Sequence, residues 1–157
     1  MEKIALFPGS FDPFTIGHQS VVNRALPLFD KIIISVGFNT QKKALLSLEN
    51  RIKLISDVFK DNSKIEVNHY EGLTIDYCIK VNAQYLLRGL RTSADFEYER
   101  AIGQMNKAMN PGIETVFLLT APEYTFVNST IVRDILFYKG DASKFLPKGI
   151  DIKKYMS

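Results

Sequence analysis

Five short apolar runs alternate with longer amphipathic segments along the 157 residues. The short runs are rich in β-branched residues and are continuous rather than alternating, as is typical of strands that are buried on both faces of a sheet. They lie at Lys3–Phe7, Lys31–Gly37, Ile65–Tyr70, Tyr85–Leu87 and Thr115–Leu119. Strands that alternate with helices predict an α/β fold, here a doubly wound, parallel, five-stranded sheet with helices on both faces.

The longer segments predict helices because their apolar residues recur at helical spacing. In Gly17–Leu28 the shared face carries Val21, Val22, Ala25 and Leu28, and in Leu48–Phe59 it carries Leu48, Ile52, Ile55 and Phe59. Ser47 and the triplet Asn128–Thr130 have the residue types that cap helices at their N-termini. The other predicted helices are Thr74–Val81, Ser93–Met109, Ser129–Tyr138 and Lys148–Tyr155.

The composition is that of a globular domain, with 46% hydrophobic and 24% charged residues. We therefore expect one domain over residues 1–157. No apolar run approaches the length of a membrane span, and the N-terminal apolar run meets Pro8 and Gly9 too early for a signal peptide. The net charge of +3 is too small to favour nucleic-acid binding. Cys78 has no second cysteine to pair with, which favours a cytoplasmic protein.

Ligands of open parallel sheets bind outside the carboxyl ends of the strands, so the segments that follow the predicted strands matter most. Glycine, hydroxyl, histidine and basic residues gather in these segments, which are Pro8–His18, Asn39–Lys43, Glu71–Thr74, Arg88–Thr92 and Ala121–Thr130. Because the carboxyl ends of parallel strands share one edge, we expect these residues to lie close together.

Two features of that edge indicate anion binding, and each has a plainer alternative. His18 falls at the start of a predicted helix, where free N–H groups and the helix dipole favour an anion, although a tight turn beside a surface histidine fits equally well. Arg88 and Arg91 offer planar forks that suit phosphate oxygens, although ion pairs with Asp95 or Glu99 would also explain them. The first loop is neither a Walker A motif nor a Gly-x-Gly-x-x-Gly motif.

The run Gly9-Ser10-Phe11-Asp12-Pro13, followed by Thr15-Ile16-Gly17-His18, resembles the signature of the nucleotidyltransferase α/β-phosphodiesterase superfamily, which has an (H/T)-x-G-H element at its first strand–helix junction. Within it the chain is most similar to the bacterial phosphopantetheine adenylyltransferase family. The similarity continues through Lys42, Arg88–Arg91, Asp95–Glu99, Asn106 and Phe145–Pro147. Three positions depart from the usual pattern: Ser10 replaces a common Thr, Tyr124 a common Trp, and Asn128 one Ser of a serine run.

This resemblance implies a Rossmann-like nucleotidyltransferase fold and an enzyme of coenzyme A biosynthesis. The implied reaction is the reversible transfer of an adenylyl group from ATP to 4′-phosphopantetheine, which gives 3′-dephospho-coenzyme A and pyrophosphate. Mg²⁺ is implied as the companion of ATP, held by substrate oxygens and water rather than by a protein cage. A homohexamer built as a dimer of trimers, and binding of coenzyme A itself, are implied as well.

The resemblance also implies roles for single residues. His18 would stabilise the transition state, Ser10 would orient the attacking phosphate, and Lys42 and Arg91 complete the implied catalytic set. The implied ATP-binding residues are Ser10, Phe11, His18, Gly89, Leu90, Arg91, Glu99, Tyr124, Thr125, Phe126, Val127, Asn128, Ser129 and Thr130. The implied phosphopantetheine-binding residues are Ser10, Lys42, Thr74, Arg88 and Asn106.

Three candidate residues receive no role in the implied active site, and several alternative functions remain open. Glu97 is read as an acidic residue favoured near a helix N-terminus, and Cys78 and His69 as structural residues because they have no partners at metal-ligand spacing. Nicotinate-mononucleotide adenylyltransferases and cytidylyltransferases share the Gly-His element, so they are the alternative functions within the same superfamily. A non-catalytic nucleotide-binding module and a nucleic-acid-binding domain are the alternatives from other classes.

Overall fold

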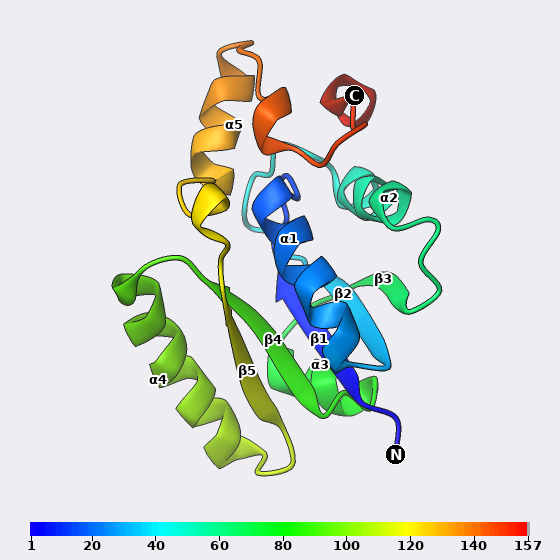
Figure 1. Ribbon diagram of the computed structural model, residues 1–157, viewed down its shortest axis with the longest axis vertical. Coiled ribbons are helices and arrows are strands. Elements are labelled where there is room, and N and C mark those ends of the chain that lie inside the picture. The colour runs from blue at the N-terminus through cyan, green and yellow to red at the C-terminus, as the bar shows by residue number, and fades with distance from the viewer. Residues whose placement is uncertain (157) are drawn as a thin grey trace.

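The computed structural model describes residues 1–156 and contains a five-stranded sheet in the order β3-β2-β1-β4-β5, in which every neighbouring pair is parallel (Figure 1). The strands are β1 (Ile4–Gly9), β2 (Lys31–Gly37), β3 (Ile65–Tyr70), β4 (Tyr85–Leu90) and β5 (Glu114–Leu119). The predicted α/β class and the parallel sheet are confirmed. β1 and β4 extend two or three residues beyond their predicted ends, so Arg88 and Gly89 lie in a strand rather than in a loop.

Five α-helices connect or follow the strands: α1 (Ile16–Ala25), α2 (Leu48–Val58), α3 (Thr74–Lys80), α4 (Ser93–Met109) and α5 (Ser129–Phe137). Short 3-10 turns lie at Leu26–Leu28, Pro122–Tyr124, Ser143–Phe145 and Ile152–Tyr155. Ser47 and Asn128 cap α2 and α5 as predicted.

Two helix predictions are wrong at their ends. The helix predicted over Gly17–Leu28 stops at Ala25, because Pro27 cannot donate the next backbone hydrogen bond, and Leu28 is half exposed rather than buried. The C-terminal helix predicted over Lys148–Tyr155 is only a 3-10 turn, since Gly149 adopts a φ of +83° just before it.

Helices cover both faces of the sheet, as the doubly wound prediction requires. On one face α1, α2 and α5 pack on side chains such as Phe7, Ile34 and Leu87 to form the larger core. On the other face α3 packs on Leu6, Ile33 and Leu86 in a smaller core. α4 has no buried residue and lies along the outer edge of the sheet beside β5 (Figure 1).

Burial on both faces holds for the central strands but not for the edge strands. β1 and β2 are buried along their middles, whereas β3 and β5 are only half buried because each lies at an edge of the sheet. On α2 the buried residues are Arg51, Leu54 and Ile55, and the predicted core positions Leu48 and Ile52 are half-buried. A buried arginine is the unexpected member of this set.

The strand order creates one place where the chain turns in opposite directions. From β1 the chain proceeds to β2 on one side, and from β4 it proceeds to β5 on the other. In open parallel sheets the crevice at such a switch point, beyond the carboxyl ends of the two strands, is where ligands bind.

Candidate active site

A cavity of about 360 Å³ lies at this switch point and is called the main cavity because it lies where ligands of such sheets bind. It is formed where β1 and β4 end and where α1 and α5 begin. The candidate residues that line it are Ser10, Phe11, His18, Arg88, Gly89, Arg91, Tyr124, Val127, Asn128, Ser129 and Thr130. Three of the five predicted segments therefore meet at this cavity, and the segments after β2 and β3 line an adjoining hollow.

His18 is held by the first turn of α1. The hydroxyl of Thr15 accepts a hydrogen bond from the His18 N–H at 3.3 Å, and the Thr15 N–H donates to Nδ1 of the imidazole at 3.0 Å. Because Nδ1 accepts this bond, the ring proton belongs on Nε2. Burial, followed by the charges of Arg88 and Arg91, lowers the pKa of His18 from 6.5 to about 4. Near neutral pH the residue is an uncharged hydrogen-bond donor.

Phe11 anchors the loop between β1 and α1. Its ring is buried against Phe7, Phe14 and His18, with ring centroids 5.1 to 5.3 Å apart. Its backbone has a φ of +47°, a left-handed conformation that is unfavourable by roughly 1–2 kcal/mol for a residue with a side chain. A Cβ on Gly9 would lie 2.8 Å from this ring, so glycine is required there. The aromatic packing thus fixes the loop backbone that faces the cavity.

Three arginines hold alternate carbonyl groups of this loop. Arg88 Nη1 donates to the Pro8 carbonyl at 2.9 Å, Arg51 Nη1 to the Ser10 carbonyl at 2.9 Å, and Arg133 Nη1 to the Asp12 carbonyl at 2.8 Å. The loop conformation is therefore set from three different elements, β4, α2 and α5.

The carboxylate of Asp12 ties this loop to the segment that follows β2. Its two oxygens accept hydrogen bonds from the N–H groups of Leu45 and Leu46, each at 2.8 Å. Lys42 lies three residues before Leu45, so the loop that carries Ser10 and the loop that carries Lys42 are joined at a buried carboxylate.

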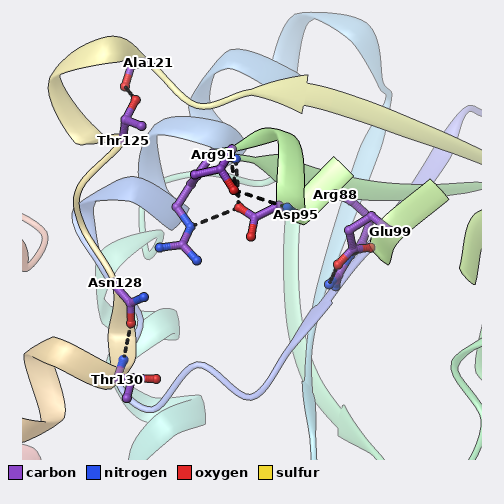
Figure 2. Close-up of polar contacts among 9 residues, drawn as sticks. Arg88, Arg91, Asp95, Glu99, Ala121, Thr125, Asn128 and Thr130 are labelled. Carbon is purple, nitrogen blue, oxygen red and sulfur yellow. Dashed lines mark hydrogen bonds and ion pairs between the residues drawn. The ribbon is translucent and has the colours of Figure 1, made fainter. Parts of the chain in front are cut away.

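Both arginines at the end of β4 form ion pairs while they line the cavity. Arg88 binds Glu99 through two hydrogen bonds of 2.9 and 2.6 Å, and Arg91 Nε lies 3.5 Å from Asp95 (Figure 2). The ion pairs considered in the sequence analysis are therefore confirmed, and both arginines also line the cavity. Glu97 points elsewhere and pairs with Arg100 at 3.0 Å.

At the start of α5 the side chain of Asn128 acts as the cap. Its oxygen accepts the N–H of Thr130 at 2.8 Å, which Figure 2 shows, and that of Ile131 at 3.4 Å. The hydroxyl of Ser129 donates to the Pro13 carbonyl, and Arg133 Nη2 donates to the Thr130 hydroxyl at 3.1 Å. Capping is thus confirmed, and hydroxyl and guanidinium groups remain at the cavity wall.

Two smaller hollows adjoin the main cavity at Pro8 and Arg88. The Lys42 hollow, about 250 Å³, is lined by Ser10, Lys42 and Thr74 among others. The Asn106 hollow, about 210 Å³, is lined by Thr74, Glu99 and Asn106 among others. All five predicted phosphopantetheine-binding residues therefore line one connected set of hollows.

A family model described as cytidylyltransferase-like matches residues 6–135. The chain is 50% identical over 149 residues to the phosphopantetheine adenylyltransferase of Flavobacterium psychrophilum, with 95% of this chain and 98% of the relative covered. It is 51% identical to the protein of the same name from Bacteroides thetaiotaomicron, with 94% and 97% covered. The chain belongs to the phosphopantetheine adenylyltransferase family.

A solved structure supports the fold independently of these relatives. The bifunctional NMN adenylyltransferase/ADP ribose pyrophosphatase from Francisella tularensis superimposes with a TM-score of 0.72 at 18% identity. The match covers 98% of this chain and 46% of that one. At this identity the likeness establishes the shared fold alone.

Four of the ATP-binding residues predicted from the sequence lie outside the main cavity. Leu90 is buried in the core, Glu99 lines the Asn106 hollow, and Thr125 donates to the Ala121 carbonyl at 3.4 Å (Figure 2). Phe126 is 68% exposed and packs edge-on against Phe145.

Sequence reasoning did not assign roles to Asp12, Thr15, Arg51 or Arg133, although the first two belong to the quoted motif. The position of Arg133 could have indicated its role, because it falls three residues after Thr130 and so shares the same helical face. No local sequence pattern could have indicated the role of Arg51, because its partner Ser10 is 41 residues away.

The described residues, 1–156, contain no group of three or more His, Cys, Asp or Glu side chains that could hold a metal ion. Cys78 is buried in the smaller core, and burial raises the pKa of its thiol to about 12. His69 lies exposed on the edge strand β3.

Proposed function

We propose that this protein transfers the adenylyl group of ATP to 4′-phosphopantetheine, giving 3′-dephospho-coenzyme A and pyrophosphate. The observation that carries the proposal is the junction at Arg88, where a cavity that contains a neutral histidine meets two hollows lined by Lys42 and Asn106. The names of relatives at about 50% identity support the same reaction. One site then receives two substrates, with their phosphates meeting beside His18.

The reaction needs positioning and charge stabilisation rather than proton abstraction. The nucleophile is a phosphate oxygen that is already anionic near neutral pH, so no general base is required. With its pKa at about 4, His18 neither supplies nor removes a proton near pH 7. Its Nε2–H instead donates to an oxygen of the α-phosphate, where negative charge increases in the transition state.

The acceptor phosphate binds at the junction of the main cavity and the Lys42 hollow. Ser10 orients it, Lys42 and Arg88 neutralise it, and Thr74 lies where the two smaller hollows meet. Glu99 and the Pro8 carbonyl hold Arg88 in place, and the second N–H of each Nη atom remains to donate to the phosphate. The pantetheine arm continues into the Asn106 hollow.

The nucleotide occupies the main cavity. Arg91, Ser129 and Thr130 bind the triphosphate, with Arg133 as a further cation beside Thr130. The adenosine lies against the segment Tyr124–Asn128, including Thr125, Phe126 and Val127. Backbone groups of Phe11, Gly89 and Leu90 complete the proposed ATP-binding set, together with Glu99, which holds Arg88 from the adjoining Asn106 hollow.

Mg²⁺ enters as the ATP complex and is part of the substrate. The ion would be held by phosphate oxygens and water. The ion would neutralise charge on the leaving pyrophosphate.

We further propose that the chain self-associates through the outer face of α4, as a homohexamer that is a dimer of trimers. The apolar side chains exposed there are Tyr98, Ile102, Met105 and Met109, whose spacing places them on one face of the helix. An exposed apolar face of this kind is typical of an interface between protein chains. Light scattering coupled to size-exclusion chromatography tests the proposal, because a monomeric mass at micromolar concentration would contradict it.

Coenzyme A, which shares the pantetheine arm and adenine of the product, is proposed as a further ligand of the same cavity. Nucleic acid and membranes are not among the proposed partners, and the cytoplasm is the proposed compartment. In the part of the chain described by the structure, no helix is long and apolar enough to cross a membrane.

The experiment that tests the proposed function is release of pyrophosphate from ATP and Mg²⁺ with different acceptors. We expect release with 4′-phosphopantetheine and none with nicotinate mononucleotide or glycerol 3-phosphate. Release with another acceptor would overturn the roles of Lys42 and Arg88. Folded protein that binds ATP but releases nothing with any acceptor would indicate a nucleotide-binding module instead.

A further inference from the structure

Arg51 has no role in the reaction as proposed, yet it contacts the loop that lines the main cavity. It lies on α2, is only 6% exposed and does not line the cavity itself. Its Nη1 donates to the Ser10 carbonyl at 2.9 Å from behind the loop.

A buried guanidinium is an unfavourable way to fill this space. Burial lowers the pKa of Arg51, and the nearby carboxylate of Asp12 only partly offsets this. The Nε atom is buried without a hydrogen-bond partner. An apolar side chain of similar length avoids both penalties but leaves the Ser10 carbonyl without its donor, so the contact with that carbonyl is what the arginine supplies here.

The geometry of the peptide that Arg51 holds supplies a reason. The peptide joining Ser10 to Phe11 is trans, and the C=O and N–H of a planar trans peptide point in opposite directions. With the carbonyl turned back to Arg51, the Phe11 N–H is directed to the opposite side, and Ser10 and Phe11 both line the cavity. Within residues 1–156 the structure gives this N–H no protein acceptor.

The peptide is also prevented from turning over. The Phe11 ring is packed between Phe7, Phe14 and His18, and the neighbouring carbonyls of Pro8 and Asp12 are held by Arg88 and Arg133.

We infer that Arg51 is a positioning residue, which orients and polarises the Ser10–Phe11 peptide so that the Phe11 N–H donates to a phosphate oxygen of the bound nucleotide. The inference rests on the proposed function for the location of that phosphate. A full positive charge at the carbonyl end of the peptide strengthens the N–H as a donor. Donors fixed before the substrate arrives are the kind that stabilise charge in a transition state.

The test combines Arg51→Met, Arg51→Lys and the matched control Arg24→Met. Arg24 also donates to a backbone carbonyl, that of Leu119, but outside the three hollows. Protein labelled with ¹⁵N-phenylalanine is titrated with ATP and Mg²⁺, and the Phe11 amide proton is followed by NMR. Steady-state kinetics and thermal melting are measured on the same samples.

In the wild-type protein and in Arg24→Met we expect ATP to move the Phe11 amide proton downfield. In Arg51→Met we expect this shift to disappear and kcat to fall about tenfold to a hundredfold, with KM for phosphopantetheine nearly unchanged and a single cooperative melting transition that shows the variant is folded. Arg51→Lys retains the charge but not the planar fork, so it should retain part of both the shift and kcat.

Any folded Arg51 variant in which the amide shift and kcat change independently would overturn the inference, as would an Arg51→Met protein that retains both. If Arg51→Met does not fold, Arg51→Lys is judged by the same rule. Wild-type protein that shows the shift but no turnover would refute the proposed function while supporting the role of Arg51 in nucleotide binding.

Discussion

Replacing His18 with glutamine separates its structural role at the start of α1 from its proposed role in the reaction. His18 is the third residue of α1 and accepts the Thr15 N–H through Nδ1. Glutamine at that position of a helix can accept the same N–H in a capping box, so the helix start is preserved. The titrating ring and its Nε2–H are lost.

The pKa of His18 sets the size of the expected pH effect. Above pH 6.5 the imidazole is neutral in both the folded and the unfolded chain, and the stability associated with its low pKa is fully present. Below pH 6.5 the unfolded chain takes up the proton first, so stability is lost until the pH reaches the folded pKa of about 4. Between pH 7 and pH 5 the wild-type protein should therefore lose about 2 kcal/mol that the glutamine variant does not lose.

Urea denaturation of both proteins at pH 7 and pH 5 measures this difference directly. The fall in the free energy of unfolding should be about 2 kcal/mol larger for the wild type than for His18→Gln. Turnover of the variant at pH 7 should fall by a factor of about 10² to 10³, while KM for ATP changes little. An equal loss of stability in the two proteins would refute the argument that His18 is buried as a neutral group.

Three further changes test other parts of the structure. Lys42→Ala should raise KM for phosphopantetheine about tenfold or more in steady-state assays, because an ion pair to the acceptor phosphate is lost. Gly9→Ala should lower the free energy of unfolding by about 1–3 kcal/mol in denaturation experiments, since its Cβ would lie 2.8 Å from the Phe11 ring. Met105→Glu should reduce the assembly mass in light scattering, because it places a charge on the exposed apolar face of α4.

Each of these changes has an outcome that contradicts its premise. An unchanged KM and kcat in Lys42→Ala would remove Lys42 from the site. Wild-type stability in Gly9→Ala would mean that the aromatic cluster around Phe11 is loose. Wild-type mass in Met105→Glu would exclude the α4 face as the interface.

Much of the fold could be predicted because strands and helices are indicated by local sequence patterns. Continuous apolar runs and helical periodicity located every strand and α-helix, and the parallel arrangement followed from their alternation. The strand order could not be predicted from the sequence, because the pairing of β1 with β4 depends on contacts between residues about 80 apart in the chain. The half-exposed edge strands follow from that order and were missed for the same reason.

The candidate site divides in the same way. Ser10 and Arg91, which directly follow β1 and β4, were predictable because parallel strands end at one edge of the sheet. Arg51 supports the loop from the middle of a helix whose other buried residues are apolar, and periodicity predicts apolar residues on a buried face. No local sequence pattern predicts a buried charged side chain that binds a distant backbone carbonyl.

The central claim, adenylyl transfer between ATP and phosphopantetheine, is tested most directly in the reverse direction. The protein is given pyrophosphate, Mg²⁺ and one adenylated compound at a time, and ATP formation is followed with luciferase. We predict ATP from 3′-dephospho-coenzyme A, none from nicotinic acid adenine dinucleotide, and loss of the signal in His18→Gln. ATP from the dinucleotide alone, or from neither compound, would contradict the account.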